Sequence, residues 1–237
     1  DLMVENTEAA VLYETNSDLV IENLNLAAPG PKEVFVQMGA AGVCHSDVHV
    51  ISGQAQQLMP CVLGHEGAGL VTSIGDQVSR VSVGDHVILS WLPYCENCYQ
   101  CIRGKTHLCK AFQTPVSNGT LLDGSCRFSN KQGPIRQLGS LGCWSENVVV
   151  SEECCVTINR SIPFEIAALL GCAVTTGVGA VLNRAKVQKG ETVVVIGAGG
   201  VGLSVVMAAK LQGASQIICI DKNRSMRNLA IELGATD

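Results

Sequence analysis

The chain has 237 residues, which is enough for one or two domains and for a sizeable hydrophobic core. Its 16 Lys and Arg residues are outnumbered by 21 Asp and Glu residues, and the formal net charge is −5. Because no basic run occurs either, the sequence lacks the electrostatic footprint of a protein that binds nucleic acid or anionic membranes. A content of 47% hydrophobic and 16% charged residues is too apolar for a disordered chain.

Cysteine usage indicates the compartment. Twelve cysteines occur without a signal-peptide pattern, which argues against a secreted disulfide scaffold. Metal or redox chemistry in a reducing compartment fits better, and we expect the protein in the cytoplasm. Two charge-free runs, residues 166–182 and 193–209, reach only the lower length limit of a membrane span. They contain Thr and Gly residues, so we interpret both as buried core and expect no membrane partner.

The first 160 residues have the sequence pattern of a β domain. Short apolar runs are separated by turn residues, for example at 34–36, 70–72, 86–89 and 147–150. Short strands at this spacing predict an all-β barrel or sandwich. Residues 92–142 depart from the pattern and are predicted to form a long loop, which needs a source of order.

After Pro163 the pattern changes to alternating helices and strands, which predicts a parallel sheet. We therefore divide the chain into domains at 1–163 and 164–237. Because two parallel strands are too few for a stable sheet, the rest of the second domain is expected beyond residue 237. The predicted elements are a helix at 164–183, a strand at 191–196, a helix at 203–211, a strand at 216–220 and a helix at 224–233.

Four cysteines in the long loop have the spacing C-x2-C-x2-C-x7-C, at Cys95, Cys98, Cys101 and Cys109. Four thiolates this close can converge on one tetrahedral ion, and the metal would order a loop that has no core. A pair of disulfides is the alternative, but a reducing compartment argues against it. A ferredoxin-type cluster needs a three-residue last gap and a following proline, whereas here the gap is seven and Lys110 follows. The spacing predicts a structural zinc site.

Further metal-ligating side chains are dispersed. Residues 42–49 read Gly-Val-Cys-His-Ser-Asp-Val-His, residues 64–66 read Gly-His-Glu, and Cys172 lies alone in an apolar segment. Taken singly, each of these residues can be explained without a metal. A lone cysteine is usually a core residue, and a His in a Gly-rich turn is often only a turn residue. Periodicity does not show that Cys44, His65 and Cys172 meet.

A glycine-rich turn follows the predicted strand at 191–196. Gly197, Gly199 and Gly202 fit G-x-G-x-x-G, a pattern that lets the backbone approach a pyrophosphate at a helix N-terminus. Asp221 ends the next strand, where a carboxylate would bind a ribose 2′-hydroxyl and repel a 2′-phosphate. The turn therefore predicts dinucleotide binding and favours NAD over NADP, although Lys222 and Arg224 follow closely.

In this order, Gly-Val-Cys-His-Ser-Asp, Gly-His-Glu-Gly-Ala-Gly, the four-cysteine loop, Leu-Leu-Gly-Cys and Gly-Ala-Gly-Gly-Val-Gly resemble the zinc-dependent medium-chain alcohol dehydrogenases. The resemblance covers essentially the whole chain. It implies a mixed β and α/β fold, in which a GroES-like β-barrel catalytic domain precedes the first part of a Rossmann doubly wound parallel sheet. The second Rossmann half and the C-terminal segment that returns to the first domain are absent from the sequence.

The resemblance also assigns roles. It implies that Cys44, His65 and Cys172 hold a catalytic zinc, which acts as a Lewis acid on an alcohol. Glu66 and Asp47 match positions around these ligands, Ser46 and His49 match a relay that removes the alcohol proton, and Trp91 matches a substrate-pocket position. The cofactor would contact a further set of residues: His45, Thr176, Gly197, Gly199, Gly200, Val201, Gly202 and Asp221.

The function implied is hydride transfer between an alcohol, or its aldehyde or ketone, and NAD, by an enzyme with two zinc ions per chain and expected to be a homodimer or homotetramer. An alternative is S-(hydroxymethyl)glutathione (formaldehyde) dehydrogenase. That branch usually has an Arg four residues after the last loop cysteine, where this sequence has Gln113. A non-catalytic NAD-binding homologue is the alternative outside enzymes, and complete ligand and relay sets argue against it.

Overall fold

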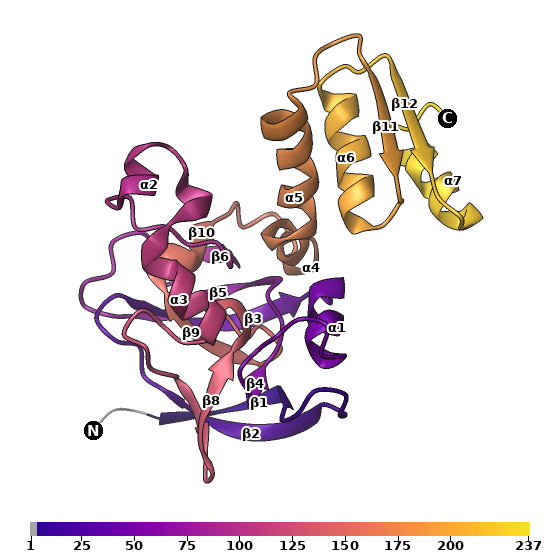
Figure 1. Cartoon of the computed structure of the whole chain (residues 1–237). Helices are drawn as coiled ribbons and strands as arrows, with labels where there is room; N and C mark the ends of the chain where they lie inside the picture. The colour runs from indigo at the N-terminus through magenta and orange to yellow at the C-terminus, as the bar shows by residue number, and fades with distance from the viewer. Residues whose placement is uncertain (1–3) are drawn as a thin grey trace. The chain divides into compact units, whose positions relative to one another are not determined.

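The structure is a computed structural model that describes residues 4–237 (Figure 1). The chain divides into two compact units, an N-terminal unit that ends at Gly171 and a C-terminal unit that spans Cys172–Asp237. Each unit has its own hydrophobic core.

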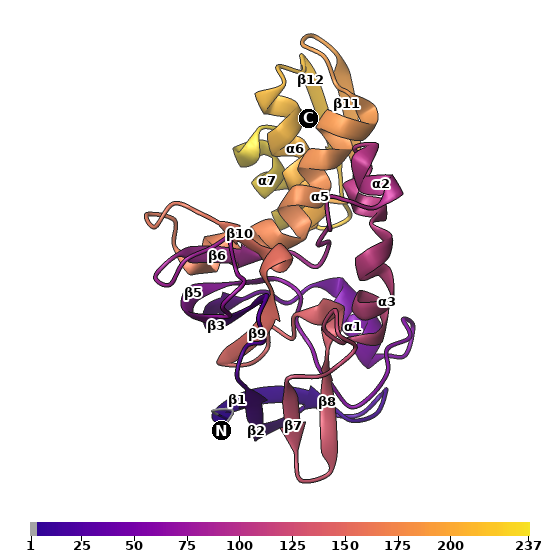
Figure 2. The same cartoon turned by 90° about the vertical axis from the view of Figure 1, so that its left-hand side faces the viewer.

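A small closed barrel forms the first half of the N-terminal unit. Neighbouring strands are antiparallel, except that β4 and β8 are parallel, and pairing of β4 with β1 closes the ring. Figure 2 shows the β7–β8 hairpin beside β1 and β2. In barrel order the strands are β1 (Val4–Leu12), β2 (Val20–Ala27), β7 (Phe128–Asn130), β8 (Gly133–Gln137) and β4 (Cys61–Val62).

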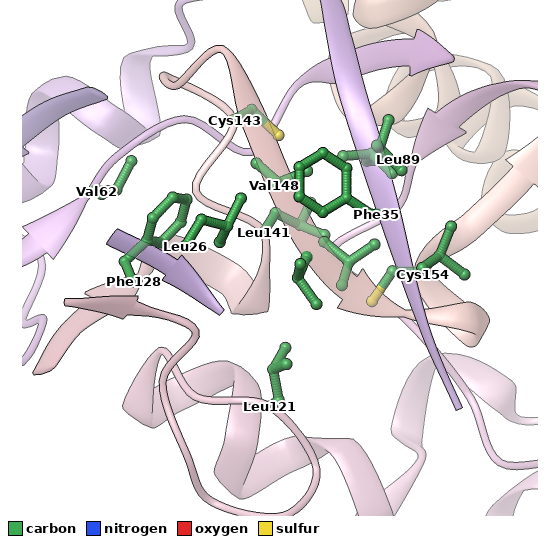
Figure 3. Close-up of a cluster of buried hydrophobic side chains, with 14 of the residues drawn as sticks. Leu26, Phe35, Val62, Leu89, Leu121, Phe128, Leu141, Cys143, Val148 and Cys154 are labelled. Carbon is green, nitrogen blue, oxygen red and sulfur yellow. The ribbon is translucent and has the colours of Figure 1, made fainter. Parts of the chain in front are cut away.

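A five-stranded antiparallel sheet forms the second half. In order it contains β10 (Cys155–Thr157), β6 (His86–Leu89), β5 (Gly67–Ile74), β3 (Glu33–Ala41) and β9 (Asn147–Ser151). Buried side chains from the barrel, such as Leu26 and Phe128, form one core with Phe35, Leu89 and Val148 from this sheet (Figure 3). The predicted β domain is confirmed.

The cysteine-rich segment is more ordered than predicted, because residues 92–142 are not one long loop. They contain helices α2 (Tyr99–Ile102) and α3 (Lys110–Asn118) and the β7–β8 hairpin. Helix α3 buries Phe112 and Pro115 and ends at Gly119, which has a left-handed conformation with φ of 65°. The sequence did not predict this helix, because its composition is polar and only two of its side chains are buried.

The predicted helix at 164–183 is also wrong, because the structure interrupts it at Cys172, whose φ of −139° and ψ of −77° are not helical. Helix α4 (Phe164–Ala167) and a 3₁₀ turn (Ala168–Gly171) pack on β5 and β6 of the N-terminal unit. Helix α5 (Ala173–Gly179) and a π-helical segment (Ala180–Ala185) belong to the C-terminal unit. The change in composition after Pro163 therefore precedes the boundary between the units by eight residues.

The C-terminal unit has the predicted strand–helix–strand–helix order. Strands β11 (Thr192–Ile196) and β12 (Gln216–Ile220) are parallel, and α6 (Gly200–Leu211) and α7 (Arg224–Leu233) follow them. Val195, Ile217 and Cys219 on one face of the sheet form a core with residues of both helices, whereas Val194, Ile196 and Ile220 are exposed. The start of a doubly wound parallel sheet is confirmed, and α6 begins three residues earlier than predicted.

Within residues 4–237, no single helix is long and apolar enough to cross a membrane. The segments Phe164–Gly171 and Ala173–Ala185 reach the required length and composition only as a bent pair.

Candidate functional site

The four loop cysteines converge. Their sulfur atoms all lie within 4.8 Å of one another, with Sγ–Sγ distances of 3.5 Å for Cys98–Cys101 and 3.6 Å for Cys95–Cys109. A disulfide would require about 2.05 Å, whereas a tetrahedral zinc with Zn–S bonds near 2.3 Å gives edges of about 3.8 Å. The distances therefore fit four thiolates around one zinc ion.

Hydrogen bonds prepare this cluster for a cation. Backbone hydrogen bonds from Cys101 and Lys110 lower the pKa of Cys98 to about 6, because they stabilise the thiolate. Burial instead raises the pKa of Cys101 to about 12, as do hydrogen bonds with the neighbouring thiols. The backbone N–H of Cys95 donates to Cys109 Sγ at 3.4 Å. An ion with a double positive charge would offset part of the negative charge that four converging thiolates create.

A second group combines Cys44, His65 and Cys172, whose ligand atoms also lie within 4.8 Å of one another. Cys44 is the residue before helix α1 (His45–Ile51), and His65 follows β4. Cys172 is peptide-bonded to Gly171, whose backbone abuts the carbonyl oxygen of Leu89 in the N-terminal unit. Two sulfurs and one imidazole make a donor set that suits zinc, and three protein ligands leave a coordination position open.

Asp47 orients two members of this group and is fully buried. Its Oδ1 accepts from the backbone N–H of Gly64 at 3.1 Å and lies 3.1 Å from Nδ1 of His65. Its Oδ2 accepts from the backbone N–H of Cys44 at 3.0 Å. A carboxylate at Nδ1 fixes the ring proton there, so Nε2 is the ring nitrogen that would serve as the metal ligand.

Trp144 connects the loops that carry these ligands. Its indole N–H donates to the carbonyl oxygen of Gly42 at 2.9 Å. Gly64 has φ of 87°, and a Cβ there would lie 2.4 Å from Cδ1 of Trp144. Only glycine therefore fits next to His65, and the tryptophan holds both loops together. Glu66 is buried in the same region, and its backbone oxygen accepts from the N–H of Gly42 at 2.9 Å.

The environment of Cys44 favours the thiolate that a metal requires. Burial raises the pKa of its thiol, but hydrogen bonds from the backbone and hydroxyl of Ser46, together with the interaction with His65, outweigh burial and lower it. The Ser46 hydroxyl lies 3.7 Å from Cys44 Sγ. A cysteine thiol becomes a strong zinc ligand only when it loses its proton to form the thiolate.

A cavity of about 220 Å³ lies in the N-terminal unit, and Ser46, Trp91 and one of the three candidate ligands, His65, line it. The ring centroids of Trp91 and His65 are 6.1 Å apart, with the planes at 79°. His49 does not line the cavity; its ring packs edge-on against His45, with the centroids 4.9 Å apart. Within residues 4–237, Ser46 and His49 share no hydrogen bond, so the relay is not connected by protein atoms alone.

Other residues of this cavity were not identified from the sequence. They include Ala55, Gln57, Val116 and Leu138, which come from three separate segments. None belongs to a motif, and only the folded barrel brings them together with Ser46. An apolar or amide side chain in a loop carries no sequence signal of this role.

The glycine turn of the C-terminal unit has the geometry of a phosphate cradle. Gly197 has φ of 99°, and Gly199 is the residue before α6, so the helix N-terminus opens at the turn. A Cβ on Gly202 would lie 1.8 Å from the carbonyl oxygen of Gly197, which excludes any side chain there. Gly200 and Val201 form the first helical turn and are exposed.

Asp221 lies at the end of β12, beside this turn. Its Oδ2 accepts from the backbone N–H of Ala198 at 2.8 Å, and Oδ1 accepts from that of Asn223 at 2.7 Å. These two hydrogen bonds lower the pKa of Asp221, so the carboxylate stays ionised at neutral pH. The two remaining cofactor candidates, His45 and Thr176, are exposed on α1 and α5.

Comparisons with known proteins agree with this geometry. The sequence model of the alcohol dehydrogenase GroES-like domain matches residues 30–160, more than half of the chain. The S-(hydroxymethyl)glutathione dehydrogenase of Saccharomyces cerevisiae is 45% identical over 231 residues, which cover 97% of this chain and 60% of that protein. The chain thus spans about 60% of the length of this relative.

Two solved structures are similar over nearly all of the chain. The alcohol dehydrogenase zinc-binding domain protein from Burkholderia ambifaria has a TM-score of 0.93 at 34% identity, covering 99% of this chain and 64% of that one. The benzyl alcohol dehydrogenase from Acinetobacter calcoaceticus has a TM-score of 0.91 at 35% identity, covering 98% and 63%. The chain belongs to the family of the alcohol dehydrogenase GroES-like domain, as the motifs indicated.

Proposed function

We propose that this chain carries the metal site and the start of the cofactor site of a zinc-dependent oxidoreductase that transfers a hydride between an alcohol and NAD. The observation that supports this most strongly is the convergence of Cys44, His65 and Cys172 beside a cavity that contains Ser46. The Saccharomyces cerevisiae and Acinetobacter calcoaceticus relatives are both dehydrogenases by name.

The residues of the site have distinct tasks. Cys44, His65 and Cys172 would hold a zinc ion, which when bound supplies Lewis acidity toward an alcohol oxygen. Asp47 holds His65 in the orientation that presents Nε2. The Ser46 hydroxyl can accept the alcohol proton and donate its own at the same time, and His49 is the proposed outer base. Cys95, Cys98, Cys101 and Cys109 would hold a second, structural zinc ion.

The cofactor assignment rests on the C-terminal unit. The turn at Gly197–Gly199–Gly202 leaves room for a pyrophosphate at the N-terminus of α6. The ionised Asp221 would accept a hydrogen bond from a ribose 2′-hydroxyl and repel a 2′-phosphate. We therefore propose NAD rather than NADP. We also propose a homodimer or homotetramer as the assembled form.

A second candidate is oxidation of S-(hydroxymethyl)glutathione. The name of the Saccharomyces cerevisiae relative, which is 45% identical, favours it. The neutral Gln113 at the position where that branch usually has an Arg is unfavourable to it. Both candidates use the same metal and cofactor residues, so they differ only in the substrate.

Steady-state NADH formation by the protein as its gene encodes it, across a panel of alcohols, tests the proposal. We expect turnover that depends on zinc and is lost in Cys44→Ala. The four-cysteine site should remain metal-loaded in that variant, which controls for folding. A protein that binds both zinc and NAD but oxidises no alcohol of the panel, with or without glutathione, would instead be a non-catalytic homologue.

A further inference from the structure

Helices α5 and α6 of the C-terminal unit carry groups of both proposed sites. Cys172, a member of the three-residue metal group, is the residue before α5, and Thr176 of the candidate cofactor set lies within this helix. The first turn of α6 contains Gly200 and Val201, two further members of the cofactor set. The spacing between the two helices therefore helps to set the distance between a candidate metal ligand and the cofactor turn.

The two helices lie side by side (Figure 1) and approach closely at Gly177, which is buried. A Cβ there would lie 2.5 Å from Cβ of Ser204. It would also lie 2.6 Å from the carbonyl oxygen of Val201 and 2.9 Å from the backbone nitrogen of Val205. The backbone of α6 fixes all three atoms, so no side chain can rotate away from the contact. Because nonbonded carbon atoms need roughly 3.5–4.0 Å, alanine in place of Gly177 would push α5 away from α6 by about 1 Å.

Side chains fill the space between these helices farther from the cofactor turn. An apolar cluster there includes Val178, Val181, Val205 and Ala208. Beside the cofactor turn, a Cβ on Gly200 would lie 3.3 Å from Cβ of Ala173, which is again closer than an ordinary contact. The lack of a side chain at Gly177 therefore lets the two backbones approach one another at the end of α6 that would receive the cofactor.

We propose that Gly177 is a positioning residue for hydride transfer. By letting α5 pack closely on the first turns of α6, it places Cys172 and Thr176 relative to the glycine turn. The inference rests on the proposed function and adds to it a residue that needs no contact with substrate or cofactor. Hydride transfer depends on such placement, because a misplacement of about 1 Å can cost on the order of 100-fold in rate.

The direct test is Gly177→Ala in the protein as its gene encodes it, with Gly179→Ala as the matched control. Both glycines lie in α5, and alanine favours a helix at both, but a Cβ on Gly179 would approach Nδ2 of Asn183 only to 3.8 Å. Single-turnover NADH formation measures hydride transfer directly. The probe is hexan-1-ol or S-(hydroxymethyl)glutathione, whichever the wild type oxidises faster. The dissociation constant for NAD and the zinc content are measured on the same preparations.

We expect Gly177→Ala to slow NADH formation about tenfold or more. Its dissociation constant for NAD should stay within about threefold of the wild-type value, because the glycine turn and Asp221 are not part of the contact between the helices. Zinc content should not change, and Gly179→Ala should behave as the wild type in all three measurements.

Three outcomes would contradict this inference. A Gly177→Ala protein with the wild-type rate would overturn it and leave the proposed function intact. A parallel loss of rate, NAD affinity and zinc would show that Gly177 is needed only for folding. A wild-type protein that binds zinc and NAD but forms no NADH from either probe would overturn the proposed function as well.

Ser204→Thr tests the same contact from the side of α6 and decides the question if Gly177→Ala does not fold. The Ser204 hydroxyl donates to the carbonyl oxygen of Gly200 at 2.7 Å. Threonine retains this hydroxyl and adds a methyl group to a residue that is only 2% exposed, so the neighbouring helix has to make room. We expect NADH formation to slow about threefold or more with NAD affinity retained. A wild-type rate in Ser204→Thr would then overturn the inference.

Discussion

Asp47 links Cys44 and His65 more directly than any motif reveals. One carboxylate accepts hydrogen bonds from the backbone of Cys44, from the backbone of Gly64 and from the ring of His65. These hydrogen bonds are all made by protein groups, so the carboxylate fixes the backbone of Cys44 and the ring of His65 relative to one another. Hydrogen-bond partners that orient metal ligands in this way favour metal affinity.

We expect Asp47→Asn to lower the zinc affinity of the Cys44 site by about 10- to 100-fold, because an amide cannot accept from the backbone and the imidazole through both of its polar atoms. Competition with a chromophoric chelator measures this. The affinity of the four-cysteine site serves as the internal control, and Asp76→Asn at an exposed position is the matched variant. Unchanged affinity at the Cys44 site would show that Asp47 does not orient its ligands.

Asp221 determines cofactor choice in our proposal. Asp221→Ser removes the charge that repels a 2′-phosphate, so the NADP to NAD ratio of binding constants should rise by an order of magnitude or more. Titration of both cofactors against the protein, monitored by fluorescence, provides the ratio. Asp237→Ser changes an exposed residue whose carboxylate accepts from the side chain of Gln216 at the other end of β12, and it should leave the ratio unchanged. A ratio that does not respond to Asp221→Ser would remove this residue from cofactor selection.

The candidate metal ligands could be recognised in the sequence, whereas the residues that line the cavity could not. Cys44, His65 and the four loop cysteines stand out because thiols and imidazoles in short motifs are unusual. Gln57 and Leu138 are ordinary residues until the barrel brings them to one cavity. The role of Cys172 depends on tertiary contacts, since locally it is indistinguishable from a core cysteine.

At the scale of elements, the cysteine-rich segment is organised around its sulfur atoms. Its buried cluster contains only Cys101, Cys109 and Phe112, with a few partly buried neighbours. So small a core supplies little stability, and we expect a metal to help order the chain between Leu92 and α3. The cysteine spacing predicts that metal, but the polar composition missed the helix, because α3 depends on the packing of Phe112 and Pro115.

We expect Cys98→Ser to weaken the metal site and loosen residues 92–115, with faster proteolysis there and lower overall stability. Hydride chemistry at the other site should persist in molecules that remain folded. Limited proteolysis with and without zinc measures the effect, and Cys126→Ser, which alters a cysteine outside both clusters, is the control. A Cys98→Ser protein with wild-type stability and loop protection would contradict the structural role of this zinc.

Trp144, like Asp47, connects the two loops that carry candidate ligands, because it contacts both the loop before α1 and the loop before β5. Trp144→Phe keeps the ring contact and removes the N–H, which leaves the carbonyl oxygen of Gly42 without this donor. We expect a loss of about 1 kcal/mol in stability and a several-fold loss of zinc affinity at the Cys44 site only. Equal weakening of both zinc sites would indicate a general loss of folding.

The hydrophobic pattern of the sequence did not predict that the helix is interrupted at Cys172. An apolar run rich in Ala and Leu predicts one continuous helix, yet the chain leaves helical geometry at the single residue whose thiol joins the metal group. Gly171 permits this by packing its backbone directly against Leu89. Tertiary contacts, such as that of Gly171 with Leu89, therefore override the local helix propensity here.

At the scale of the whole molecule, the composition and the spacing of short apolar runs correctly predicted the fold class of both units. The barrel and the five-stranded sheet follow from short apolar runs, and β11, β12 and α7 lie within one residue of their predicted positions. The pairing order of the strands could not be predicted from the runs themselves. It depends on long-range contacts such as the parallel pairing of β4 with β8.

We propose that the chain holds two zinc ions, one at the four-cysteine site and one at the site of Cys44, His65 and Cys172. Elemental analysis of the purified protein measures this most directly. We expect two zinc ions per chain in the wild type, one in Cys44→Ala and one in Cys98→Ala, with the remaining ion at the unaltered site in each case. A wild-type content of one or none, or variants that keep both ions, would contradict the account.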